Sequence, residues 1–387
     1  QGVSSAASDV YKRQTEIMAG TGPDVLLLDG ISEDTYIEKG MLEDLSGVLK
    51  DTDILSNIKD AYTKEDGSIY TMPVKFGIPM IEGNKDIIAG ITDLTTEADA
   101  AESQKDSYGK LQFFSDFSIA PSYLIQGTID NSIPAWMNED GTLNENAVKE
   151  YLEQVNRIWQ TQKNAIEETK KAYQMGDDWA DSDHSGYMDI SGSVTSLLAK
   201  VDTVAAGGLL SPEGLVSLDS ARKVDPDLDY KLLNGQSENC FYPRSAVGVS
   251  AKASEKEAAE KFVKFLFEEE SQRASNTEGL AVNSKVYEDM AYWKMGKSSG
   301  DTIGSIGASY DTGDGNIKQI EMDEIIPEDE AIQNIMDLGK TLTVPAKSNQ
   351  IIRNAVTESG EKYLNGETGL DDAVKEIMQE VNLYLSE

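Results

Sequence analysis

Carboxylate side chains follow two of the apolar runs in this sequence. Asp29 comes directly after Val25–Leu28, and Asp116 follows the predicted strand Lys110–Phe114 after a single serine. The run Val25–Leu28 has the length of a strand that is covered on both faces, which predicts a parallel α/β sheet. In open sheets of this kind, ligands bind just outside the carboxyl ends of the strands. We therefore expect Asp29 to meet a ligand, with a cap on the following helix as its alternative role.

Sequence signals bound the elements on either side of Asp29. A helix ends at Gly20, and Gly22–Pro23 makes the turn into the strand. Ser32–Asp34 provides an N-cap and an acidic first turn for the next helix, and Gly40 ends that helix. The carboxylate is thus predicted to lie between a strand and a short helix.

Further elements are predicted along the chain. Apolar residues recur at helical spacing in Tyr151–Lys171 and in Ser254–Glu270. A T-x-x-D capping box at Thr368 begins the last helix. Ala246–Ser250 is short and apolar, as expected of a strand, whereas Met175–Gly186 is acidic and aperiodic, which predicts an exposed loop. The pattern favours a compact α/β protein.

Composition limits the class of protein. A chain of 387 residues with 39% hydrophobic content can bury a large core, and its length favours about two or three domains. Its net charge of -35 opposes binding to nucleic acids and to anionic membranes. The single cysteine, Cys240, excludes an internal disulfide, and we expect it to be inert. No run approaches the length of a transmembrane helix, and residues 1–14 show no signal-peptide pattern.

Signals for other chemistry are weak. Gly20–Gly22 resembles the opening of a dinucleotide fingerprint, but it precedes its strand and Pro23 breaks the pattern. The only histidine, His184, excludes zinc clusters and would place a catalytic triad in an acidic loop. Asp181–Gly186 matches the first half of a calcium-binding loop, but Gly192 stands where the bidentate glutamate should be. This excludes a complete EF-hand and leaves an isolated calcium site as an alternative. A chain with 69 acidic residues always contains pairs of carboxylates, so such pairs are no evidence for glycoside hydrolysis.

The order of the motifs resembles the extracellular solute-binding proteins of carbohydrate ABC importers, the maltose-binding-like family 1. The unit Thr15–Leu45, with GTGPDVLLLD at its centre, carries the first part of the resemblance. MPVKFGIPMIEGNKD, which ends at Asp86, resembles the first passage between two lobes. The segment Phe241–Gln272 resembles the return passage and its long helix, and DAVKEIMQEVNLYLSE fits the C-terminus. The resemblance covers nearly everything from Thr15 to Glu387.

The resemblance implies an α/β periplasmic-binding-protein-like fold with two lobes, each a mainly parallel sheet flanked by helices. The first lobe is expected to lack its first β-α-β segment. Residues 1–14 lack the pattern of the following helix and are expected to be non-native, so that the family's export signal and lipid-anchor cysteine would precede Thr15. The expected lobes are residues 15–79 with 250–315, and residues 80–249 with 316–387.

The two passages carry glycines at Gly77 and Gly248. A cleft spanned by a few strands can close through changes in a few backbone angles, so these glycines are candidate hinges. A glycine in a strand can also mark a close approach of another chain segment. Both alternatives stay open at the sequence level.

The resemblance implies a binding protein that captures a sugar or oligosaccharide and delivers it to a membrane permease. It implies a monomer that uses no cofactor and catalyses no reaction, located extracellularly as a lipoprotein or in the periplasm. A peptide or a polyamine is the alternative ligand. A glycan-cleaving enzyme and an adhesive surface lipoprotein are the alternative classes.

Sugars offer hydroxyl groups that donate and accept together, and their ring faces are apolar, so polar and aromatic residues at strand ends are the candidate ligands. The candidate ligand-binding residues are Asp29, Gly30, Lys75, Phe76, Asp116, Phe117, Tyr123, Trp136, Tyr187, Ser193 and Arg244.

Several of these candidates have a second interpretation. Phe117, Tyr123 and Tyr187 could be core residues, because aromatic side chains in α/β proteins are mostly buried. Arg244 could pair with a surface carboxylate, and Trp136 is either a stacking platform or an anchor of its own lobe. Many relatives carry a tryptophan where this chain has Val194, which favours a compact site for a mono- or disaccharide.

Overall fold

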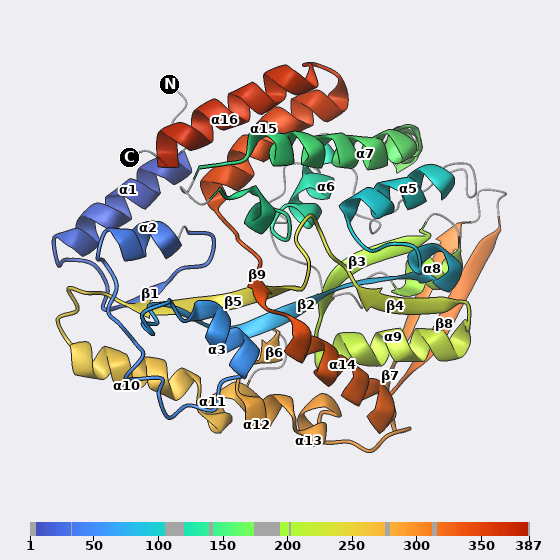
Figure 1. Ribbon diagram of the computed structural model, residues 1–387. Helices are drawn as coiled ribbons and strands as arrows, with labels where there is room; N and C mark the ends of the chain where they lie inside the picture. Colours follow the sequence, from blue (N-terminus) through green and yellow to red (C-terminus); the bar gives the residue numbers. More distant parts are fainter. Residues whose placement is uncertain are drawn as a thin grey trace.

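The computed structural model describes residues 5–31, 33–104, 120–138, 142–173, 194–200, 203–274, 279–311 and 316–385. Its centre is a sheet with helices on both faces (Figure 1). Within the described ranges seven strands join this sheet: β1 (Val25–Leu27), β2 (Met72–Asn84), β3 (Ala205–Leu210), β4 (Leu228–Leu232), β5 (Cys240–Val249), β6 (Leu280–Ala281) and β9 (Val344–Pro345). The main path runs β1-β5-β2-β3, while β4 and β6 pair with β2 and β9 pairs with β5.

Strand β2 joins the two parts of the sheet because it is long enough to pair differently along its length. Its first half pairs with β5, where Met72 lies opposite Val247. Its second half pairs with β3 and β4, where Met80 lies opposite both Gly208 and Leu232. The two predicted passages are therefore real strands, and they pair with each other.

The strand directions differ from the expected parallel sheet. Between the described strands every pairing is antiparallel except that of β5 with β9. Strands β2 and β5 cross the molecule in opposite directions, so their ladder is antiparallel. In β1, Leu26 is buried but Leu27 is 57% exposed, so the apolar run is not covered on both faces. An apolar run does not report the direction of neighbouring strands, which is why this prediction was wrong.

One face of the sheet is covered by a helical layer that appears at the top of Figure 1. Its core includes Ile81, Trp136, Tyr151, Ile352 and Val381. The two helices predicted at residues 151–171 and near Thr368 are both present in it. The layer contains α4 (Lys85–Ile88), α5 (Leu94–Gln104), α6 (Pro121–Thr128), the 3-10 turn η1 (Ile133–Trp136), α7 (Glu145–Tyr173), α15 (Gln350–Asn365) and α16 (Leu370–Leu385).

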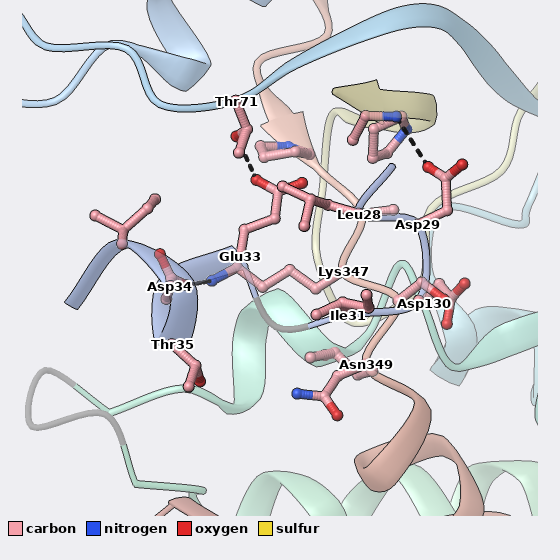
Figure 2. A pocket seen from close by; sticks show the side chains of 18 of the residues that line it. Leu28, Asp29, Ile31, Glu33, Asp34, Thr35, Thr71, Asp130, Lys347 and Asn349 are labelled. Carbon is pink, nitrogen blue, oxygen red and sulfur yellow. Dashed lines mark hydrogen bonds and ion pairs between the residues drawn. The ribbon is translucent and has the colours of Figure 1, made fainter. Parts of the chain in front are cut away.

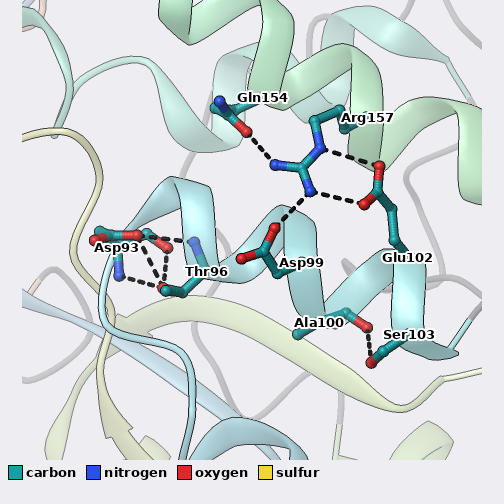
Figure 3. A network of polar contacts seen from close by, with 8 residues as sticks. All are labelled: Asp93, Thr96, Asp99, Ala100, Glu102, Ser103, Gln154 and Arg157. Atoms are coloured by element: carbon teal, nitrogen blue, oxygen red, sulfur yellow. Dashed lines mark hydrogen bonds and ion pairs between the residues drawn. The ribbon is translucent and has the colours of Figure 1, made fainter.

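A polar clamp on Arg157 joins helices α5 and α7 in this layer (Figure 3). The guanidinium donates to both carboxylate oxygens of Glu102, at 3.0 and 2.7 Å, and to Asp99 Oδ1 at 2.5 Å. Its remaining nitrogen donates to Gln154 Oε1 at 2.6 Å. Bidentate geometry of this kind fixes the register between two helices more strongly than a single ion pair.

The opposite face carries the larger core, which includes Phe76, Val263, Tyr287 and Ile335. The helix predicted at residues 254–270 is present but ends at Leu266, and a second short helix follows it. The layer contains α3 (Ser56–Tyr62), α10 (Lys256–Leu266), α11 (Glu269–Arg273), α12 (Ser284–Tyr287), α13 (Met290–Trp293) and α14 (Asp329–Thr341).

A two-stranded hairpin lies at one end of the molecule, beside β3 and β4 (Figure 1). Strands β7 (Thr302–Asp311) and β8 (Ile317–Ile325) pair along their whole length and contact α8 (Val194–Ala199) and α9 (Pro212–Val224). The lobe boundary expected between residues 315 and 316 falls inside this hairpin. The division into lobes stays a prediction. We propose that both strands of the hairpin belong to the same lobe as α8 and α9, which they contact.

Helices α1 (Ser5–Met18) and α2 (Glu33–Glu38) pack beside β1 around a small third core. Ile17, Leu26 and Tyr36 are buried there. The capped helix predicted after Asp29 is therefore α2. Helix α1 extends across the expected boundary between residues 14 and 15. The expectation that residues 1–14 are non-native stays a prediction.

The two candidate hinge glycines are closely packed. A Cβ atom on Gly77 would lie 2.9 Å from Leu209 Cδ1, and one on Gly248 would lie 3.1 Å from Leu42 Cδ2. These distances are shorter than ordinary van der Waals contact, so a side chain at either position would require the neighbouring leucine to shift. Close approach is thus a sufficient reason for both glycines.

Cys240 begins strand β5 and is fully buried. Burial raises the pKa of its thiol to about 12, because the thiolate would lose its hydration there. This burial agrees with the expectation of an inert cysteine, which stays a prediction.

Candidate ligand-binding cleft

A cavity of about 1250 Å³ opens at the end of β1, between α2 and the layer that holds α15 (Figure 2). One group of its lining residues comes from the β1–α2 turn, α2 and the segment before β2: Leu28, Asp29, Gly30, Ile31, Glu33, Asp34, Thr35, Ile37, Glu38, Ala61, Tyr62, Lys64, Tyr70 and Thr71. A second group comes from the helical layer and the strands β5 and β9: Asp130, Ile133, Met137, Asn138, Thr142, Tyr242, Pro243, Arg244, Ser245, Ala246, Pro345, Ala346, Lys347, Ser348, Asn349, Ile352 and Asn382.

Asp29 lies at the rim of the cavity, as predicted, and Gly30 lies beside it. Its Oδ1 accepts a 3.0 Å hydrogen bond from the Ala246 backbone N–H of β5, so its carboxylate binds β5. Burial raises the pKa of Asp29, while the backbone N–H groups of Ala246 and Ser245 and the charge of Arg244 oppose that rise. Asp29 thus anchors the end of β1 and still faces the cavity.

Ser245 has a left-handed backbone with φ of 55°, which is unusual for a residue other than glycine. It stands between Arg244 and Ala246, and all three line the cavity. Strained residues of this kind cluster at ligand sites, where the surrounding structure holds them in place. The predicted site residue Arg244 therefore reaches the cavity from a constrained turn in β5.

The neighbouring carboxylates Glu33 and Asp34 have different partners. Thr71 Oγ1 donates a 2.7 Å hydrogen bond to Glu33 Oε2. Lys347 Nζ lies 2.9 Å from Asp34 Oδ2, and Lys64 Nζ lies 3.3 Å from Asp34 Oδ1. Figure 2 shows the bonds of Glu33 to Thr71 and of Asp34 to Lys347.

Their pKa values follow from these partners. Desolvation raises the pKa of Glu33 to about 7, outweighing the Thr71 hydrogen bond and the more distant lysines. Burial also acts to raise the pKa of Asp34, but Lys347 and Lys64 outweigh it and hold that pKa below its ordinary value. Adjacent residues on one short helix thus differ in charge near neutral pH.

The side of the cavity formed by α15 is held by a buried ion pair. Arg353 Nη1 lies 2.5 Å from Asp130 Oδ1, and these side chains are 10% and 1% exposed. The backbone N–H of Lys347 donates to Asp130 O, and that of Gln350 donates to Gly30 O, both at 3.0 Å. The segment between β9 and α15 therefore connects Asp130 with the β1–α2 turn.

Three tyrosines, Tyr62, Tyr70 and Tyr242, supply the aromatic surface of the cavity. None of them was predicted as a site residue. Tyr62 lies at the end of α3 and Tyr242 on β5, and both are largely buried, whereas Tyr70 is partly exposed. Aromatic rings in such positions can cover the apolar face of a ligand ring.

Four of the predicted site residues lie outside the lining of this cavity. Lys75 is buried, and its ammonium donates to Gln272 O at 2.5 Å near the end of α11. Phe76 packs edge-on against Phe241 in the larger core. Both lie on β2, the predicted first passage, and their side chains are buried inside the protein.

Trp136 and Tyr123 also belong to the helical layer. Trp136 is completely buried against Tyr151, with ring centroids 5.0 Å apart, and its indole N–H donates to Gln236 Oε1 at 2.5 Å. The structure therefore supports the anchoring alternative for Trp136. Tyr123 is a partly buried member of the same core.

The remaining predicted site residues, Asp116, Phe117, Tyr187 and Ser193, lie outside the described residues. The same holds for His184 and the half calcium loop. The sequence also showed the polar residues of α2 without revealing their role, because Glu33 and Asp34 were interpreted only as favourable charges at a helix start. Lys347 gave no signal, since nothing local predicts that it reaches α2.

The family is shown by its sequence profile, described as bacterial extracellular solute-binding protein, which matches residues 2–273. The chain belongs to this family. No curated protein matches the chain. No described helix is both long enough and apolar enough to span a membrane.

Solved structures share the fold at low sequence identity. A family 1 extracellular solute-binding protein from Alicyclobacillus acidocaldarius is 16% identical, with a TM-score of 0.52 over 98% of this chain and 88% of that one. An ABC-transporter-associated binding protein from B. animalis subsp. lactis, in complex with β-1,6-galactobiose, is 14% identical, with a TM-score of 0.54 over 100% and 90%. A Streptococcus pneumoniae solute-binding protein, in complex with the blood group A-trisaccharide, is 15% identical, with a TM-score of 0.52 over 100% and 90%. The fold is therefore that of the two-lobe solute-binding proteins, as predicted.

Proposed function

We propose that this protein captures a sugar or a short oligosaccharide in the cleft and delivers it to the permease of an ABC importer. The observation that carries the proposal is the chemistry of the cavity. Asp29 and Glu33 offer hydrogen-bond acceptors, Arg244 and the amide NH2 of Asn349 offer donors, and tyrosine rings supply apolar faces. Such a mixture suits a ligand that is covered with hydroxyl groups.

The solved relatives support the same class of ligand. The proteins from B. animalis and S. pneumoniae were captured with a galactobiose and a trisaccharide. A cavity of about 1250 Å³ has room for a sugar of that size. The expected compact site for a mono- or disaccharide remains part of the proposal.

Location and partners follow from the family and stay proposals in their finer detail. We place the protein outside the cytoplasmic membrane, as a lipid-anchored or periplasmic monomer that docks on permease subunits. It releases its ligand unchanged, without cofactor or catalysis. Its net charge of -35 keeps it from adhering to anionic lipid surfaces while it shuttles.

A thermal-shift panel tests the proposal. Galactose, glucose, maltose and β-1,6-galactobiose are each added at millimolar concentration, with spermidine and a tripeptide as probes for the other ligand classes. A ligand that binds only the folded state raises the melting temperature, and at 100 times its Kd it stabilises by about 2.7 kcal/mol. A shift with a peptide or spermidine and none with any sugar would overturn the proposal.

Two further measurements complete that test. Chromatography of the incubated disaccharides should recover them unchanged, whereas a cleaved product would show an enzyme. Small-angle scattering should give a smaller radius of gyration at saturation, since the cleft closes around its ligand.

A further inference from the structure

The two lysines that line the cavity both pair with the same one of two adjacent carboxylates. Lys64 and Lys347 both form ion pairs with Asp34, and in the described part of the chain no lysine or arginine lies within ion-pair distance of Glu33. Asp34 is therefore neutralised from both sides. Glu33 keeps a carboxylate in the cavity with only a hydroxyl donor, Thr71, beside it.

The position of Glu33 is well defined. Thr71 is 2% exposed and begins the approach to β2, and its hydroxyl holds Glu33 Oε2 at 2.7 Å. Among the described residues no hydrogen bond to the other carboxylate oxygen, Oε1, is found, so it can accept one from a ligand in the cavity that Glu33 lines. A partly buried carboxylate without a cation beside it gains most from a hydrogen-bond donor that arrives with the ligand.

We propose that Glu33 selects the ligand by charge, so that the cleft takes a solute presenting an O–H or N–H donor at this point and rejects one carrying a carboxylate, phosphate or sulfate there. This inference rests on the proposed function and narrows its ligand class to neutral and amino sugars. An anionic group beside Glu33 would leave two negative charges in a poorly hydrated site, without a cation between them.

The charged surroundings of Glu33 agree with this selection. The charged groups that act on its carboxyl are Asp34, Lys347 and Lys64, and Glu33 in turn acts on the hydroxyl of Tyr62, as do Asp29 and Asp34. Desolvation raises the pKa of Glu33 to about 7 in the empty cleft. A ligand that donates to the carboxylate favours its charged form, so binding should strengthen as pH rises through 7.

The size of the pH effect follows from that pKa. The charged fraction of Glu33 rises from about one tenth at pH 6 to about nine tenths at pH 8, so affinity for a donor ligand should rise about tenfold between them. Removing the carboxyl should remove this dependence. A merely structural role for Glu33 would change affinity without changing its dependence on pH.

The experiment compares matched sugars by isothermal titration calorimetry at pH 6 and pH 8. The probes are galactose, galactosamine and galacturonic acid, and the corresponding glucose series. In the wild-type protein at pH 8, where Glu33 is mostly charged, the uronic acid should bind at least tenfold more weakly than the neutral sugar. In Glu33→Gln, the neutral sugar should bind more weakly at pH 8, the gap to the uronic acid should narrow, and the pH dependence should disappear.

Two companion variants keep the test decisive. Glu33→Asp retains the charge and should still reject the uronic acids, which separates charge selection from a general disturbance of α2. Glu321→Gln removes one negative charge from the exposed face of β8 and should leave all affinities unchanged. Melting curves of each variant establish that it is folded.

The outcomes separate this inference from the proposed function. Equal binding of galactose and galacturonic acid by the wild-type protein, or an unchanged pH dependence in Glu33→Gln, would overturn charge selection while leaving sugar capture intact. Binding of no sugar in the panel would instead overturn the proposed function, and the selection inferred from it.

Discussion

Lys347 and Asp34 meet across the mouth of the cleft, with Lys347 Nζ 2.9 Å from Asp34 Oδ2. Lys347 lies between β9 and α15, while Asp34 lies on α2, more than 300 residues away in the sequence. The ion pair therefore connects the segments on the two sides of the ligand-binding cavity. Lys64 approaches the same carboxylate but comes from the same side of the cavity as α2.

We expect Lys347→Met to release a bound sugar severalfold faster, because the variant loses its contact across the cleft. Stopped-flow fluorescence measures the release rate. Both side chains are about half exposed, so the change in unfolding free energy should stay below about 1 kcal/mol, and the effect on release should shrink in high salt. Lys64→Met is the matched control, since it removes the other ion pair of Asp34 without bridging the cleft. Equal release rates in the two variants would contradict this role.

The stability of the empty protein should depend on Glu33 in a defined pH window. Its pKa is about 7 in the folded state against an ordinary 4.5, so between these values the folded protein holds a proton that the unfolded chain releases. The stabilisation is therefore present in full below about pH 4.5 and is lost as pH rises through 7. Relative to Glu33→Gln, the wild-type protein should lose about 1–2 kcal/mol between pH 4.5 and 8, after allowance for partial exposure.

Urea unfolding of both proteins at intervals across that range measures the difference. A stability difference that stays constant with pH would show that the carboxyl of Glu33 is hydrated like a surface group. A difference that shifts in favour of the wild-type protein as pH rises would show a lowered pKa, and either result would contradict the prediction.

We expect Asp130→Ala to destabilise the protein by about 3–5 kcal/mol, because it leaves the buried guanidinium of Arg353 without its counter-charge. Chemical denaturation measures the change. Asp229→Ala breaks the exposed ion pair with Arg222 and should cost less than about 1 kcal/mol. Similar losses of stability in the two variants would mean that water takes the place of the Asp130 carboxylate beside Arg353.

Gly83→Ala should destabilise the protein by more than about 2 kcal/mol. Its Cβ would lie 2.6 Å from Val204 O and 2.9 Å from Ala205 Cα, where β2 and β3 approach closely, and backbone atoms cannot move aside cheaply. Gly127 lies within helix α6, and a Cβ atom there would meet no atom within 4 Å. Gly127→Ala should therefore stabilise the protein by about 0.5–1 kcal/mol, because alanine favours a helix more than glycine does. Thermal melting of the two variants should therefore shift in opposite directions.

Local patterns predicted much of the fold. Helical spacing located α7 and α10, the capping residues located α2, and the two passages that the family resemblance indicated became β2 and β5. These features depend on residues close together in the sequence. The direction of the strands did not follow, because pairing partners such as Met72 and Val247 are far apart along the chain.

The site was predicted in part. Asp29, Gly30 and Arg244 line the cavity, because strand ends and strand crossings can be located from sequence. Lys75 and Phe76 were placed correctly in the passage, but which way β2 directs each side chain depends on the layers that pack against it. The sequence allowed two roles for Trp136, and its burial against Tyr151 shows that it belongs to the core.

The sequence by itself determined the family, the capped unit around GTGPDVLLLD and the carboxylate at its end. Only the tertiary structure decided which charges meet: Lys347 and Lys64 neutralise Asp34, and Glu33 is left with Thr71. The reason is physical. Helix starts and strand ends depend on neighbouring residues, whereas the pKa of a carboxyl in a cleft depends on desolvation and on charges that distant segments bring to it.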